Sequence, residues 1–114
     1  MEKYIAILKT YSDMLQFMHW NTAKDYASHI LMERLMNDIG ELLDRFVEVT
    51  MGAKSIVHID YEKFKKEDIK NLPLKEFIQH SKEEFGGLLM DATETEQNVI
   101  VDILEMLDRH LYLL

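Results

Sequence analysis

Hydrophobic side chains recur along the chain at intervals of three and four residues, the spacing of one face of an α-helix. The first such stripe is formed by Tyr4, Leu8, Tyr11, Leu15 and Met18. The last is formed by Ile100, Ile103, Leu104, Leu107, Leu111 and Leu114. Only one proline and four glycines occur among the 114 residues, so long helices are expected throughout.

The stripes and the breaks between them predict four helices. We expect them near residues 3–21, 24–51, 73–91 and 94–113. Hydrophobic residues thin out over 53–71, which we interpret as a crossover with room for one short helix, because structureless loops of this length are uncommon. The predicted fold class is all-α: a single domain, residues 1–114, forming a four-helix bundle with a long crossover between the second and third helices.

Residues with strong local preferences mark the expected helix ends. Asn21, Thr22 and Asp25 are candidates for ending the first helix and capping the second. Gly52 is a natural stop for the second helix, Pro73 favours the start of the third, and Thr93 to Glu96 fits a capping box. The pair Gly86-Gly87 is expected either to interrupt or bend the third helix or to admit another backbone. Gly40 could likewise permit the close approach of a partner helix.

Composition narrows the functional classes. The chain has no cysteine, so disulfides and thiolate metal sites are excluded. The net charge of −8 makes direct DNA binding unlikely, since that depends on Lys and Arg neutralising phosphates. No hydrophobic run reaches the ~20 residues of a membrane span, and Met1 to Tyr4 carry no signal peptide. A cytoplasmic protein without membrane contact is therefore expected.

Polar residues on the predicted second helix share one side of it. With His29 placed at zero, Glu33 falls at about 40°, Asp44 at about 60° and Glu48 at about 100° around the axis. The adjacent quadrant is hydrophobic, so this acidic stripe should border a buried face. That face contains Met32, Met36, Ile39, Leu43 and Phe46.

Histidine and carboxylates at one helix seam form the ligand set of a metal site in a bundle. His19 borders the hydrophobic stripe near the end of the first helix and can join this set. The candidate metal ligands are His19, His29, Glu33, Asp44 and Glu48. The competing interpretation is that these are solvated surface groups, since 21 acidic residues make such pairs easy to find. For His58, His80 and His110 a structural or exposed role is expected.

Residues 14–52 resemble the Dps family, the miniferritins of the ferritin-like superfamily. A His-Trp-Asn segment late in the first helix is followed in that family by two motifs of the second helix, fifteen residues apart. The residues that match are His19-Trp20-Asn21, then His29 and Glu33, then Asp44 and Glu48. The step from His19 to His29 is shorter than usual in the family, so a tighter turn is expected.

The resemblance implies a ferritin-like bundle with a ferroxidase centre at a two-fold dimer interface. His19, His29 and Glu33 of one chain would face Asp44 and Glu48 of the other, with Trp20 near the metals. Iron, as one ion or two shared between subunits, would be oxidised by peroxide or oxygen and sequestered. The expected assembly is a homo-oligomer, at least a dimer and at most a hollow shell. The alternative is a helical oligomeric interaction protein with a vestigial metal site.

Overall fold

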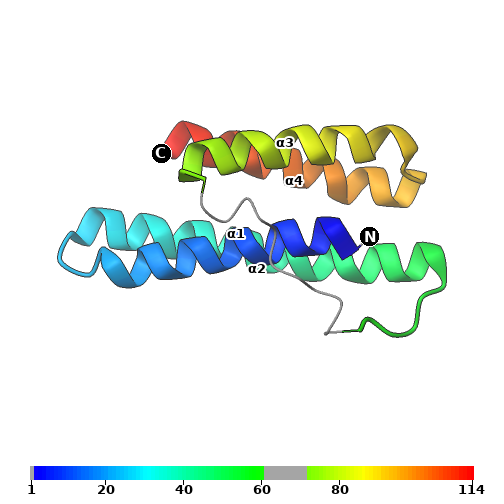
Figure 1. Ribbon diagram of the computed structural model, residues 1–114, viewed down its shortest axis with the longest axis horizontal. Helices are drawn as coiled ribbons and strands as arrows, with labels where there is room; N and C mark the ends of the chain where they lie inside the picture. The colour runs from blue at the N-terminus through cyan, green and yellow to red at the C-terminus, as the bar shows by residue number, and fades with distance from the viewer. Residues whose placement is uncertain (1, 61–71) are drawn as a thin grey trace.

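The computed structural model describes residues 2–60 and 72–114, which form four α-helices (Figure 1). These are α1 (Glu2–Asn21), α2 (Tyr26–Lys54), α3 (Leu74–Asp91) and α4 (Glu94–Leu113). The prediction of an all-α chain with four packed helices is confirmed, and each expected helix end lies within three residues of the observed one. None of the described helices is both long and hydrophobic enough to cross a bilayer.

The helices pack as two antiparallel pairs. α1 and α2 form one pair, and α3 and α4 form a second that lies against it (Figure 1). Because α2 and α3 run in the same direction, the end of α2 and the start of α3 lie at opposite ends of the bundle (Figure 1). Residues 55–73 therefore connect the two ends of a molecule 45 Å long, and the predicted crossover is confirmed. The short helix expected within it falls largely on residues 61–71, outside the described residues.

Two of the predicted caps are present. Asp25 is the N-cap of α2, and its carboxylate accepts from the backbone N–H and the hydroxyl of Ser28. Thr93 and Glu96 form a reciprocal capping box at the start of α4: the Thr93 hydroxyl accepts from the Glu96 N–H, and the Glu96 carboxylate accepts from the Thr93 N–H. These contacts fix the turn between α1 and α2 and the turn between α3 and α4.

The expectations for Gly52 and for an interruption at Gly86 are wrong. α2 continues past Gly52 to Lys54, and Ser55 (φ 54°) takes the left-handed cap conformation instead. α3 runs uninterrupted through Gly86, because buried Phe85 before the glycine pair and Leu89 after it hold the helix to the core. Among the described residues, no heavy atom outside the local helix backbone lies within 4 Å of a Cβ built at Gly40 or Gly86, so no other helix of the same chain approaches closely at either position.

The hydrophobic core draws on all four helices. Phe46 of α2 meets Phe85 of α3 edge to face, with ring centroids 5.6 Å apart. The predicted inner face of α2 is confirmed, since Met32, Ile39 and Phe46 are buried. At the chain end Leu111 and Leu114 pack on the core. The other large buried side chains include Leu8, Leu15, Leu35, Phe77, Ile100, Ile103 and Leu107.

Candidate metal centre

The tight turn between α1 and α2 brings His19 and His29 into contact. Thr22 closes α1 by donating its hydroxyl hydrogen bond to the Met18 carbonyl at 2.9 Å. Three residues later Asp25 starts α2, so His29 lies in the first turns of the new helix beside the last turn of the old one. The two imidazole rings stack with centroids 3.9 Å apart and an angle of 20° between their planes.

Each histidine is fixed by the backbone of the other. His29 Nδ1 lies 2.8 Å from the His19 carbonyl oxygen, and His19 Nδ1 lies 3.2 Å from the His29 carbonyl oxygen. A carbonyl oxygen can only accept, so both Nδ1 atoms must carry the hydrogen. In the neutral ring the lone pair is then on Nε2, and within the described residues neither Nε2 has a hydrogen-bond partner. Metal-binding histidines are oriented in the same way, with one nitrogen donating to a carbonyl and the other free for the ion.

The three carboxylates are exposed and spread along α2. Glu33 follows His29 by one helical turn, whereas Asp44 lies fifteen residues from His29, about 22 Å along the axis. Asp44 and Glu48 therefore cannot reach an ion held by the histidines of the same chain. Within the described residues, no three His, Asp or Glu side chains of one chain are grouped to hold a metal. The structure brings together His19 and His29, and it places Asp44 and Glu48 out of their reach within one chain.

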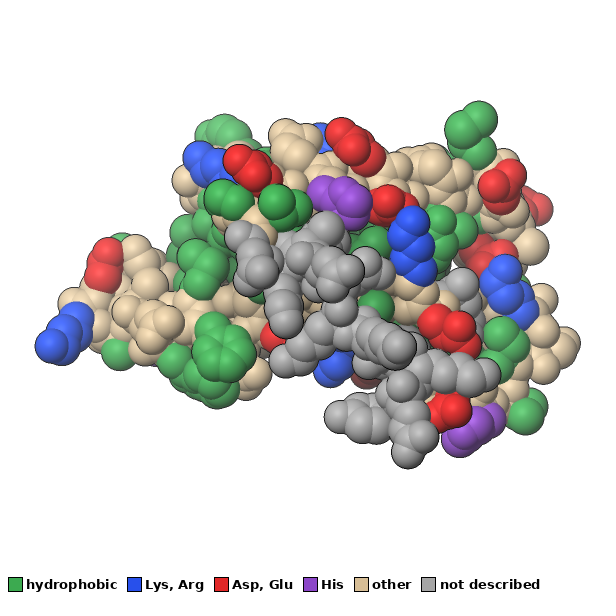
Figure 2. All heavy atoms as spheres, in the orientation of Figure 1, with side chains coloured by type: hydrophobic (Ala, Val, Ile, Leu, Met, Phe, Trp, Pro, Cys, Tyr) green, Lys and Arg blue, Asp and Glu red, His purple; other side chains and the backbone are tan. Residues whose placement is uncertain are grey.

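Trp20 lies next to the histidine pair but points outward. It is 56% exposed and meets Phe17 edge to face, with centroids 5.3 Å apart. On the face shown in Figure 2, hydrophobic side chains gather toward the end where α1 meets α2, whereas charged side chains of both signs are interspersed over α3. Trp20 does not contribute to the core in the way its size would suggest.

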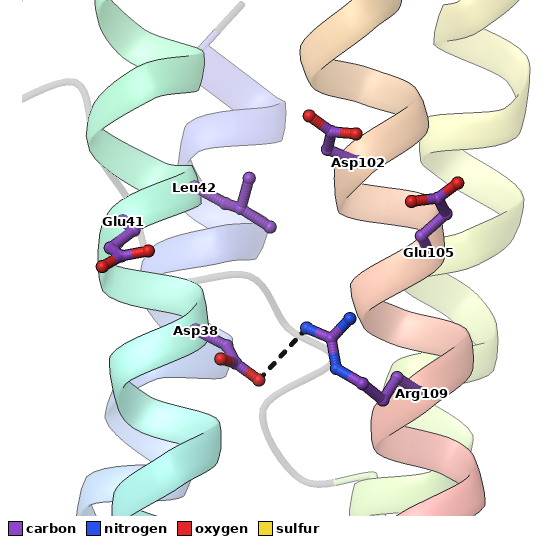
Figure 3. Close-up of a pocket in the computed structure, with 6 residues that line it drawn as sticks. All are labelled: Asp38, Glu41, Leu42, Asp102, Glu105 and Arg109. Atoms are coloured by element: carbon purple, nitrogen blue, oxygen red, sulfur yellow. Dashed lines mark hydrogen bonds and ion pairs between the residues drawn. The ribbon is translucent and has the colours of Figure 1, made fainter.

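A polar cavity of about 230 Å³ opens between α2 and α4. Asp38 and Arg109 point toward each other across it, with Oδ2 and Nη2 3.3 Å apart (Figure 3). A second ion pair, between Arg45 and Asp102, links the same two helices. Because arginines pair two of its carboxylates, the cavity differs from a typical cation site. Its lining residues are Asp38, Glu41, Leu42, Asp102, Glu105 and Arg109.

The chain belongs to a family of unknown function, DUF5856. The family match covers residues 19–114, which is most of the chain. No curated protein and no solved structure matches the sequence. The DUF5856 match begins at His19 and includes all five candidate ligands, but it assigns no chemistry to them. The function must therefore be inferred from the geometry of this chain.

A second cluster, formed by Tyr11, Asp38 and His110, was missed by the sequence analysis. His110 is fully buried, with Nδ1 2.6 Å from the Tyr11 hydroxyl and Nε2 2.9 Å from Asp38 Oδ2. The expectation of a structural role is met, but its partners lie on two other helices. The spacing could have indicated the burial, because His110 follows Ile103 by seven and Leu107 by three residues on the hydrophobic stripe of α4.

Burial shapes the protonation of this cluster. Desolvation lowers the pKa of His110, and the hydrogen bond and charge of Asp38 only partly oppose that effect. Desolvation, with a contribution from the charge of Asp38, raises the pKa of Tyr11 well above its usual value of 10.0. At neutral pH the imidazole is therefore uncharged and the phenol is protonated. One arrangement satisfies every group: Tyr11 O–H donates to Nδ1, and Nε2–H donates to Asp38.

Proposed function

We propose that this chain is an iron(II)-binding, ferroxidase-type protein of ferritin-like architecture, whose metal site forms between two copies of the chain. The observation that carries the proposal is the histidine pair. His19 and His29 each donate Nδ1–H to a backbone carbonyl and direct an unpartnered Nε2 away from it. Two preoriented nitrogen ligands at the surface end of a helix pair suit an imidazole–carboxylate iron site.

The spacing along α2 supports a two-fold arrangement for the missing ligands. The midpoint between His29 and Glu48 falls between Asp38 and Ile39, and so does the midpoint between Glu33 and Asp44. Two α2 helices packed antiparallel around that point would place His29 opposite Glu48 and Glu33 opposite Asp44, as an isologous interface requires. Gly40 lies beside the proposed axis, is exposed, and has open space around its Cβ position, so a second helix can approach.

The direction of the helices also supports ferritin-like architecture. Parallel α2 and α3 joined by a long crossover are the connection that one-crossover bundles of this class use. In the proposed reaction iron(II) is the substrate. Two iron(II) ions each give up one electron, and one peroxide molecule accepts both and, with two protons, becomes water. Carboxylates contributed by both chains would neutralise the ions, and sequestration of the ferric product in an oligomer would follow.

An interaction protein with a vestigial site is the second candidate. The exposed aromatic side chains favour it: Trp20 and Phe17 are more than half exposed, and Tyr26 at the start of α2 is 79% exposed. Aromatic side chains at a surface are typical anchors of protein interfaces. This reading requires no metal and predicts none of the oxidation described below.

Iron(II) titration of the pure protein, with its mass determined in solution, tests the proposal. Wild-type protein should oxidise iron(II) rapidly as a dimer or larger assembly. His29→Ala and Asp44→Ala should each abolish rapid oxidation, whereas the matched control Glu105→Ala, an exposed carboxylate on α4, should not.

Mixing the two inactive variants tests whether the site is shared. A mixed dimer holds one site with both substitutions and one with neither, so random reassociation should restore about a quarter of the wild-type sites. Absence of restored oxidation, although mixed dimers form, would show that His29 and Asp44 do not meet across the interface. A wild-type protein that is monomeric or oxidises no iron would overturn the proposal, and an oligomer that oxidises no iron would leave the interaction protein as the remaining candidate.

A further inference from the structure

The contact between Tyr11 and His110 is a phenol hydrogen-bonded to a buried base. The Tyr11 oxygen and His110 Nδ1 are 2.6 Å apart, and the two side chains are 1% and 0% exposed. The far side of the imidazole is held by Asp38, 2.9 Å from Nε2, and Asp38 is in turn held by Arg109 at 3.3 Å. Three helices thus contribute one line of hydrogen bonds that ends at the polar cavity between α2 and α4.

Such a line suits the coupled loss of an electron and a proton. A phenol that loses one electron becomes a strong acid, and its proton must leave if the radical is to be neutral. The Tyr11 side chain is 1% exposed, so bulk solvent does not reach its hydroxyl, but His110 Nδ1 offers a lone pair within hydrogen-bond distance to receive that proton. The imidazolium formed would be stabilised by the Asp38 carboxylate already bonded to Nε2.

We propose that Tyr11 is a redox-active residue, which gives one electron to a one-electron oxidant while its phenolic proton moves to Nδ1 of His110. The O–H bond of Tyr11 breaks, an N–H bond forms on the imidazole, and the electron reduces the oxidant, for example an oxygen-derived radical. The products are a neutral phenoxyl radical and an imidazolium paired with Asp38. Return of one electron from a reductant and of the proton from His110 restores the starting state.

The other described tyrosines lack this arrangement. Among residues 2–60 and 72–114, Tyr11 alone has a hydrogen bond from its hydroxyl to a titratable base. Tyr26 and Tyr112 are 79% and 88% exposed, so radicals formed there would be open to solvent and to each other. Trp20 lies nine residues along α1 from Tyr11, about 13 Å, and its exposure makes it an entry point for oxidising equivalents.

The experiment uses the metal-free protein, so it does not depend on the proposed iron site. Azide radicals generated by pulse radiolysis oxidise the protein, and freeze-quenched samples are followed by electron paramagnetic resonance. The wild type should give a tyrosyl signal that persists, and its formation should slow in deuterated water because a proton moves. Tyr11→Phe should lose the persistent signal, whereas the control Tyr112→Phe should keep it.

His110→Gln separates the base from the hydrogen bond. Glutamine can accept from the Tyr11 hydroxyl but cannot take its proton, so the persistent signal should be lost although circular dichroism shows a folded helical protein. A persistent signal that survives in Tyr11→Phe would overturn the proposal. Two results on the wild type alone would also overturn it: a signal that decays as fast as that of an exposed tyrosine, and a signal whose formation shows no solvent isotope effect. Neither measurement requires a variant to fold.

Discussion

Two histidine clusters in this bundle use the same side chain in opposite ways. At the turn between α1 and α2, His19 and His29 each donate one hydrogen bond from Nδ1 to a backbone carbonyl, and their Nε2 atoms have no partner among the described residues. In the core, both ring nitrogens of His110 are hydrogen-bonded to side chains of other helices. The first cluster is open to an external ligand, and the second is a closed link between α1, α2 and α4. Metal binding should therefore depend on the first cluster, and the stability of the bundle chiefly on the second.

The largest expected effect on stability is at His110. His110→Ala leaves Tyr11 and Asp38 without their buried partner and opens a cavity, so the free energy of unfolding should fall by about 3 kcal/mol or more. His29→Ala removes one hydrogen bond at the half-exposed end of the bundle and should cost about 1 kcal/mol or less. Urea unfolding followed by circular dichroism measures both. Equal losses at the two positions would remove the distinction between an open and a closed cluster.

Metal binding should produce the next effect, and only through the open cluster. At a hundredfold excess over its dissociation constant, a bound ion should add about 2.7 kcal/mol to the free energy of unfolding. The shift should be present in the wild type with iron(II), manganese or zinc and absent in His29→Ala. A folded His110→Gln variant should retain it. If none of the three metals moves the wild-type melting curve, the open cluster is vestigial.

Acid should weaken the closed cluster. The pKa of His110 is lowered in the folded protein below the ordinary value of 6.5, chiefly by burial, so the unfolded chain binds more protons between the two values. The stability contributed by neutral His110 is complete above about 6.5 and is lost as the pH falls from there through the folded pKa. The difference in unfolding free energy between wild type and His110→Gln should shrink over this window. A difference that stays constant with pH would mean that His110 does not titrate on unfolding.

The smallest effect should come from α3, which supplies no side chain to either cluster. Gly86→Ala should raise the free energy of unfolding by about 0.5–1 kcal/mol, because alanine is the better helix former and the Cβ position is free of neighbours within 4 Å. Thermal melts of this variant give a baseline for changes unrelated to histidine. A loss of stability would indicate that the space beside Gly86 is filled, for instance by a second chain.

The helices could be predicted closely because their signals are local. Hydrophobic spacing and the Thr93–Glu96 capping box fix the bounds of α4 without reference to the rest of the fold. The prediction from Gly52 was wrong because a local preference for glycine at a helix end does not decide where packing stops, and α2 ends at Lys54 with Ser55 as its cap. The contact between His19 and His29 could be expected from the short turn that separates them. The sequence could not show that each imidazole donates a hydrogen bond to the backbone carbonyl of the other residue.

The closed cluster was beyond the reach of sequence reasoning because its partners are remote. Asp38 and His110 are 72 residues apart and Tyr11 and His110 are 99 apart, so no local pattern pairs them. The proposed metal site between two chains could not be established from the sequence for a different reason. Asp44 and Glu48 are placed by the spacing on α2, but the chain that they would face is a second copy, so its contacts are proposed from symmetry and not from one fold.

Because His19 and His29 each donate to the backbone carbonyl of the other, the loss of one imidazole should leave the remaining one in place. The support for each ring is a backbone atom of the other residue, and that atom survives any side-chain substitution. In His19→Ala the imidazole of His29 would still donate Nδ1–H to the carbonyl of position 19 and keep its orientation. A chain that lost one histidine would therefore retain a correctly aimed second one, and the loss could be reversed by restoring a single residue.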